Sequence, residues 1–212
     1  MHGLSNNKLM HYRIIYIFIL LLTLLLSCSK KNNERCTSLY EKAFNCWLQY
    51  SLTDSTLCLE EAKQYLDSID CKPVKRKVFE LNLSIRYLLK DYEGGKKYVE
   101  SFNSSDFSTN YKKDMYIKAF EVAILESKGD TVNRNQLFKE LINEIQLYLN
   151  KNPNEESLYD LFLVKRIIED QNKILKEIEH IRSSKQYEDK VIDNIILMLT
   201  ANNDENKTFT FN

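Results

Sequence analysis

Glycine and proline are scarce, with four glycines and two prolines among the 212 residues. So few turn-forming residues exclude a sandwich, barrel or propeller built from many short strands, and they leave no glycine-rich phosphate-binding loop. The chain also has no excess of charge of either sign, because it contains 30 Lys and Arg and 30 Asp and Glu. Binding to nucleic acid therefore has no global electrostatic support. The hydrophobic fraction of 43% and the length are those of an ordinary globular chain of about one domain, which the scarcity of turns predicts to be helical.

Histidine is rare as well, and His180 is the one histidine after residue 27. A single histidine excludes Ser-His-Asp, Cys-His and multi-histidine metal sites unless a partner contributes groups. His180 itself lies near the end of an expected helix, where a solvated or carbonyl-capping role is typical. Gly94-Gly95-Lys96-Lys97 lacks the strand and the spacing of a phosphate-binding loop. We therefore expect no enzyme, no catalytic residue, no cofactor and no metal.

The N-terminal segment has the layout of a targeting signal. Lys8, His11 and Arg13 precede an apolar run of 13 residues from Ile14 to Leu26. A helix of that length is about 20 Å long and would not cross the ~30 Å hydrocarbon core of a bilayer. The run therefore favours a secretory signal peptide, with a short anchor helix or cleavage at another site as the alternatives.

The end of this run, Leu25-Leu26-Ser27-Cys28, resembles the lipobox of bacterial lipoproteins. The resemblance implies that residues 1–27 are removed and that Cys28 is lipidated and becomes the new N-terminus, which anchors the chain to a membrane surface. By the same resemblance, Ser29 favours sorting to the outer membrane. The segment Lys30–Asn33 lacks the acidic cluster of surface-export signals, which favours the periplasmic face. Residues 28–35 would then be a tether.

Four more cysteines follow Cys28, and all of them lie before residue 72: Cys36, Cys46, Cys58 and Cys71. An even number of cysteines in an oxidising compartment suggests disulfides. A zinc site is the less favoured alternative, because zinc sites use close pairs and the spacings here are 10, 12 and 13. Free buried thiols are the other alternative.

The positions of these cysteines fit two antiparallel helices. The pattern predicts helices over Ser38–Tyr50 and Thr56–Ile69, joined by a turn at residues 51–55. Residues that face each other across such a turn have nearly constant index sums. Cys46 with Cys58 gives 104 and Cys36 with Cys71 gives 107, so both pairs centre on the turn. We therefore predict two nested bonds, Cys46–Cys58 and Cys36–Cys71.

The rest of the chain repeats with a period of 39 to 40 residues around Asp91, Asp130 and Asp170. A further backward shift places a turn at Leu52, so the register predicts four helical hairpins, closed by a fifth helix over Tyr187–Leu199. Apolar residues keep the same offsets from the three aspartates: Leu83, Ile85, Val99 and Phe102; Val122, Ile124, Phe138 and Leu141; Phe162, Val164, Ile178 and Ile181.

Two segments resemble tetratricopeptide repeats. Tyr87–Val99 looks like the turn between the two helices of a repeat, and Asn150–Asn154 looks like the proline-bearing junction between repeats. The period exceeds the 34 residues of that family, and most repeats lack its small residue on the first helix. The resemblance implies an all-α fold, a right-handed tetratricopeptide-like solenoid over residues 36–201. An irregular helical bundle is the alternative.

Each of the two remaining polar segments has two possible interpretations. Residues 202–212 are expected to be a flexible tail, although the alternation in Thr208–Asn212 would also suit a strand added to a partner's sheet. The basic run Lys72–Lys77 either is solvated or faces an acidic partner or lipid headgroups.

These observations favour a periplasm-facing outer-membrane lipoprotein that binds a protein, either an envelope component or a toxin, through a helical-repeat surface. The partners expected are that protein and, through the lipid, the membrane, with no nucleic acid. One alternative is an immunity lipoprotein that neutralises a delivered toxin. The other is an envelope lipoprotein that binds a ligand or acts on glycan.

Overall fold

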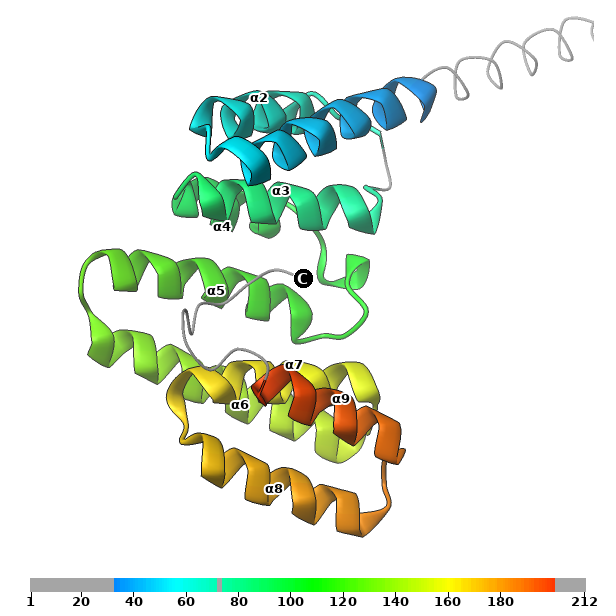
Figure 1. Ribbon diagram of the computed structural model, residues 1–212, viewed down its shortest axis with the longest axis vertical. Helices are drawn as coiled ribbons and strands as arrows, with labels where there is room; N and C mark the ends of the chain where they lie inside the picture. The colour runs from blue at the N-terminus through cyan, green and yellow to red at the C-terminus, as the bar shows by residue number, and fades with distance from the viewer. Residues whose placement is uncertain (1–32, 72–73, 201–212) are drawn as a thin grey trace, which may run out of the picture. The chain divides into compact units, whose positions relative to one another are not determined.

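The computed structural model describes residues 33–71 and 74–200, and this part of the chain contains helices and no strand, as predicted for an all-α fold (Figure 1). The signal peptide, Cys28 and the C-terminal tail lie outside the described residues. Within them, no helix combines the length and the apolar character that crossing a bilayer requires. A first helix covers residues 33–53, and it is followed by α2 (Thr56–Asp67), α3 (Arg76–Leu88), α4 (Tyr92–Glu100), the 3-10 turn η1 (Ser104–Asp106), α5 (Lys112–Ser127), α6 (Thr131–Lys151), α7 (Glu155–Ile168), α8 (Gln171–Ser184) and α9 (Asp189–Thr200).

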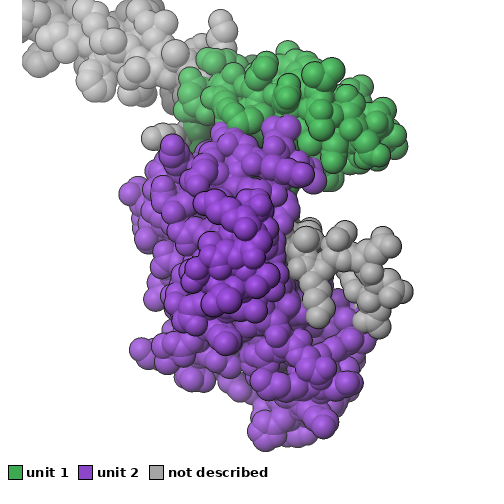
Figure 2. Space-filling model, turned by 90° about the vertical axis from the view of Figure 1, so that its left-hand side faces the viewer, with its two compact units in different colours: residues 1–85 green, residues 86–212 purple. Residues whose placement is uncertain are grey.

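The chain forms two compact units, residues 1–85 and residues 86–212, with their boundary inside α3 (Figure 2). In the first unit, the helix over residues 33–53 and α2 are joined by a tight turn at Asp54 and Ser55. Asp54 has a φ of 53°, and its backbone N–H donates to the Tyr50 carbonyl at 2.8 Å. The helix over residues 33–53 includes residues 33–35, which the sequence assigned to the tether, so only the four residues 29–32 separate Cys28 from it.

These two helices, which we call the first helix pair (residues 33–71), each have one buried stripe. The buried residues recur at helical spacing, at positions 36, 43 and 46 of the first helix and positions 59, 62 and 66 of α2. Small side chains, Ala43 and Ala62, are among them and are fully buried. A disulfide between Cys36 and Cys71 joins the beginning of the pair to its end.

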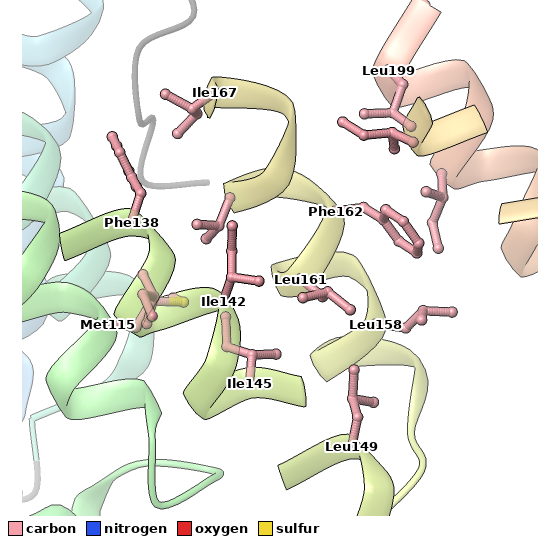
Figure 3. Packing of buried hydrophobic residues seen from close by; sticks show 14 of the residues in the cluster. Met115, Phe138, Ile142, Ile145, Leu149, Leu158, Leu161, Phe162, Ile167 and Leu199 are labelled. Carbon is pink, nitrogen blue, oxygen red and sulfur yellow. The ribbon is translucent and has the colours of Figure 1, made fainter. Parts of the chain in front are cut away.

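In the second unit each helix from α4 onward packs against the next one along the chain, and α7 also packs against α9. The core is a continuous cluster of aliphatic and aromatic side chains from α5 to α9. Figure 3 shows side chains of α6 and α7, among them Ile142, Ile145 and Leu161, filling the space between the two helices. Phe138 and Phe162 belong to this cluster and are almost fully buried.

The three aspartates that define the 39- to 40-residue register are helix N-caps. The carboxylates of Asp91, Asp130 and Asp170 each accept a hydrogen bond at 3.1 Å from the backbone N–H three residues later, at the start of α4, α6 and α8. The turns therefore lie where the sequence placed them. Positions that share an offset from these aspartates also share burial, as in the set Leu83, Val122 and Phe162 and the set Val99, Phe138 and Ile178.

One glycine is required by close packing between α4 and α5. A Cβ added to Gly95 would lie 2.2 Å from Cε1 of Phe120, whose ring is fully buried. Glycine thus lets the Phe120 ring approach the α4 backbone.

Candidate functional site

A buried polar cluster joins the beginning of α5 to the beginning of α7. Tyr111 Oη lies 2.7 Å from Asp160 Oδ2, to which it donates, and it is hydrogen-bonded to Ser157 at 2.8 Å. Lys112 Nζ donates to Asp160 Oδ1 at 2.9 Å and lies 3.3 Å from a carboxylate oxygen of Glu156. The side chains of Lys112 and Asp160 are only 8% and 10% exposed, so this ion pair is shielded from water.

The protonation states in this cluster follow from its burial and from Asp160. Burial, followed by the nearby Asp160 carboxylate, raises the pKa of Tyr111 far above its ordinary value of 10. Burial alone would lower the pKa of Lys112, but the Asp160 carboxylate outweighs it and the pKa of Lys112 is raised. At neutral pH, Tyr111 therefore keeps its proton and Lys112 its charge. Neither group can take a proton from Ser157, and we interpret the cluster as a clamp that holds α5 to α7.

A row of four aromatic rings lies next to this clamp: Tyr98, Phe102, Phe107 and Tyr116, which we call the aromatic row. Successive ring centroids are 5.1, 6.3 and 6.1 Å apart. All four residues are partly exposed. The guanidinium carbon of Arg86 lies 5.5 Å from the centroid of the Tyr98 ring and extends the row. The rings come from α4, from the connection over residues 101–111 and from α5.

Hydrogen bonds hold this connection in place. Lys113 Nζ donates to the carbonyls of Glu100 at 3.2 Å and Phe102 at 2.5 Å. The Asp106 carboxylate accepts from the Asn103 backbone N–H at 2.8 Å and closes the turn around η1. Ser108 Oγ donates to Glu156 at 3.2 Å, which ties the connection to α7. The aromatic row is therefore presented on a fixed segment.

The sequence predicts neither the clamp nor the aromatic row. Tyr111 and Asp160 are 49 residues apart, so no local spacing pairs them. The row has a weak local signal, because Tyr98 and Phe102 are four residues apart at the end of a helix. The close spacing of Phe102 and Phe107 around a capped turn would have strengthened it.

The structure contains one of the two disulfides that the sequence predicted. Cys36 and Cys71 are bonded, with their Cα atoms 6.3 Å apart. Cys46 and Cys58 carry free thiols, so the inner bond is not formed in the structure, which differs here from our expectation. Cys58 Sγ donates to Gln49 Oε1 at 3.8 Å. Burial, followed by the charges of Glu61 and Cys58 and a hydrogen bond to Glu61, raises the pKa of Cys46.

Two further sets of side chains are of types that can bind a metal: the cluster of Cys36, Asp70 and Cys71, and His180. The sulfurs of Cys36 and Cys71 and a carboxylate oxygen of Asp70 lie within 4.8 Å of one another. Because the two sulfurs are bonded to each other, neither is a thiolate that could bind a metal. His180 is exposed on α8, as expected for a solvated histidine.

No protein-family model matches the chain, and no curated protein or solved structure matches it. Inference about function therefore starts from the chemistry of its own side chains.

Proposed function

We propose that this chain is a lipoprotein that is anchored through an acylated Cys28 to the periplasmic face of the outer membrane and binds a protein partner. The apolar run of residues 14–26, which ends in the lipobox-like Leu25-Leu26-Ser27-Cys28, supports the anchor. Several acyl chains on one cysteine each bury many CH₂ groups at about 0.8 kcal/mol per group, which is enough to hold a protein at a bilayer surface.

The partner-binding surface is proposed to belong to a tetratricopeptide-like solenoid of antiparallel helical hairpins. This arrangement is supported by the three aspartate N-caps at intervals of 39 and 40 residues and by the packing of each helix from α4 onward on the next. Stacked helical pairs present long surfaces that suit the binding of extended segments of other proteins.

The observation that carries the proposal is the aromatic row. Aromatic rings supply large contact areas at a low cost in conformational entropy, and aromatic residues and Arg are enriched at the centres of protein interfaces. In this protein the rings of Phe102 and Phe107 are partly exposed, and hydrogen bonds to Lys113, Asp106 and Ser108 hold the segment that carries them. A prearranged row of this kind loses little freedom on binding.

The test is an in-cell crosslinking pull-down of the full chain with quantitative mass spectrometry. Replacing Phe102 and Phe107 together by Ala should lower recovery of the partner about tenfold or more, since interface anchors contribute at least ~2 kcal/mol each when truncated. The control is Leu197→Ala, which removes an exposed apolar side chain on α9, away from the aromatic row. Recovery of the same proteins with the double variant would contradict the proposed surface. The recovered protein also decides between an envelope component and a toxin.

The anchor has a separate test. Intact-mass analysis of the mature chain should show acyl chains on an N-terminal Cys28, and Cys28→Ala should release the protein from membranes. An unmodified Cys28 inside a longer chain would contradict the lipoprotein assignment and leave the test of the aromatic row unaffected.

A further inference from the structure

The first helix pair carries an apolar surface that is separate from the aromatic row. Phe44, Leu48 and Leu52 follow each other at intervals of four residues on the helix over residues 33–53, with exposed fractions of 37%, 42% and 85%. Leu57, in the first turn of α2, is 72% exposed. We call these four residues the apolar stripe. Half of the large hydrophobic residues found exposed in the described chain belong to it, and a concentration of this kind marks an interaction surface.

Aromatic residues with polar atoms border the stripe. The ring of Phe44 stacks on Trp47 with centroids 5.6 Å apart and on Tyr40 with centroids 6.1 Å apart. The ammonium group of Lys77 lies 4.2 Å from the centroid of the Tyr40 ring. Trp and Tyr beside leucines are the side chains that collect at the boundary between lipid headgroups and acyl chains, because one part of each ring is apolar and another is polar.

We propose that the apolar stripe lies in the headgroup region of the same membrane that holds the lipid anchor. This inference rests on the proposed acylation of Cys28. Four residues separate Cys28 from residue 33, and the five steps from one Cα atom to the other span about 17 Å even when fully extended. The beginning of the first helix is therefore held next to the headgroups. A helix of this length can then lie along the surface with its apolar side buried about 5–10 Å deep.

The charge of the first helix pair predicts which lipid surface it prefers. Residues 33–71 contain seven acidic and three basic side chains, a net charge of −4. The four basic residues that follow, at positions 72, 75, 76 and 77, offset this charge, and Arg76 among them is paired with Glu80 at 2.7 Å. The net charge over residues 33–77 is zero, so apolar contact has to supply the attraction to lipid. The stripe should therefore insert into zwitterionic lipid at least as well as into anionic lipid.

Trp47 is the single tryptophan of the chain, and it reports on this surface directly. The acylated full chain is reconstituted in phosphatidylcholine vesicles with and without bromine on the acyl chains, since bromine quenches tryptophan at short range. We expect Trp47 emission about twofold lower in the brominated vesicles, as for a ring at the depth of an interfacial helix. Adding phosphatidylglycerol should not increase the quenching.

Matched variants keep the test independent of folding. Phe44→Ser with Leu48→Ser should abolish the quenching and leave the helix content unchanged, because both side chains are exposed. Val132→Ser with Leu147→Ser, at two exposed positions of α6, should leave the quenching as it is.

The outcomes separate this inference from the proposed function. Unquenched Trp47 in a chain whose mass shows acylation would overturn the inference and leave the anchor in place. Quenching that survives Phe44→Ser with Leu48→Ser would also overturn it. A photo-crosslinking amino acid in place of Leu48 gives a further result: adducts with another protein or with a second copy, in place of lipid, would also overturn the inference. A chain without acyl groups would overturn the anchor and, with it, the inference.

Discussion

At the scale of single residues, Lys112 shows how this chain uses a buried charge. Its ammonium group is 2.7 Å from the Asp160 carboxylate, and Tyr111 donates to the same carboxylate at 2.7 Å. Removing one partner from such a group leaves buried polar atoms without compensation, which costs more than the intact hydrogen bond contributes. The clamp should therefore be sensitive to the loss of a single hydroxyl.

Tyr111→Phe tests the clamp. We expect the free energy of unfolding to fall by about 1–3 kcal/mol, because Asp160 loses a buried hydrogen-bond donor and the Ser157 hydroxyl loses its hydrogen-bond partner. Urea denaturation followed by circular dichroism measures the loss. Tyr65→Phe is the control, since it removes an exposed hydroxyl that donates to Glu61 at 2.8 Å, and it should leave the stability almost unchanged. Equal effects of the two changes would contradict the clamp.

The number of cysteines that react with an alkylating reagent shows whether the chain contains one disulfide or two. When the chain is purified without reductant, denatured and treated with iodoacetamide, the structure predicts alkylation at Cys46 and Cys58 and protection of Cys36 and Cys71. In the native chain Cys46 should react more slowly than Cys58, because it is buried and its raised pKa leaves less thiolate at a given pH.

Peptide mass spectrometry reads both results. Protection of all four cysteines would show that the inner Cys46–Cys58 bond predicted from the sequence also forms. Alkylation of all four would contradict the bond that the structure contains.

At the scale of helices, the contact between α4 and α5 depends on the absence of a side chain. Gly95 faces the buried Phe120 ring so closely that even a methyl group has no room. A helix interior normally gains stability when alanine replaces glycine, by roughly 0.5–1 kcal/mol. Here packing and helix propensity act in opposite directions, and the short distance indicates that packing dominates.

Gly95→Ala should therefore destabilise the protein, by about 1–3 kcal/mol, the usual cost of overpacking a core. Combining it with Phe120→Leu should cost less than the sum of the two single changes, because the smaller side chain makes room for the methyl group. Lys97→Ala, on the exposed side of α4, is the control. A more stable Gly95→Ala variant in thermal unfolding would contradict the contact.

The helical elements were predictable where local chemistry determines them. Asp91, Asp130 and Asp170 cap helices through backbone groups three residues away, so a spacing along the sequence reveals them. The Cys36–Cys71 bond follows from the geometry of two helices joined by a short turn. The clamp and the aromatic row could not be predicted in this way, because Tyr111 and Asp160 meet only when α5 and α7 pack.

At the scale of the whole molecule, the stability of the second unit depends on buried tyrosine and lysine side chains that keep their protons, and it should be lost in alkaline solution. Burial, with smaller effects of Glu126 and Tyr92, raises the pKa of Tyr87 from 10 to about 12. The pKa values of Tyr111 and Lys112 are raised as well. Each of these groups binds its proton more tightly in the folded chain than in the unfolded chain, so folding is favoured as long as the unfolded chain also holds the proton.

Stability should therefore be nearly constant between pH 7 and 9 with respect to these groups, and it should fall from about pH 10 as the pH rises through the folded pKa of Tyr87 near 12. Thermal unfolding at a series of pH values measures this. Tyr87→Phe should reduce the slope above pH 10, because phenylalanine does not titrate. Stability that rises with pH in this range would contradict the assignment.

Photo-crosslinking in living cells shows whether a protein binds at the aromatic row. A benzophenone amino acid replaces Phe107 in the full chain, and the same amino acid replaces exposed Leu197 as the control. We expect irradiation to join one dominant protein to position 107 and not to position 197. No adduct at position 107, or the same adducts at both positions, would contradict it.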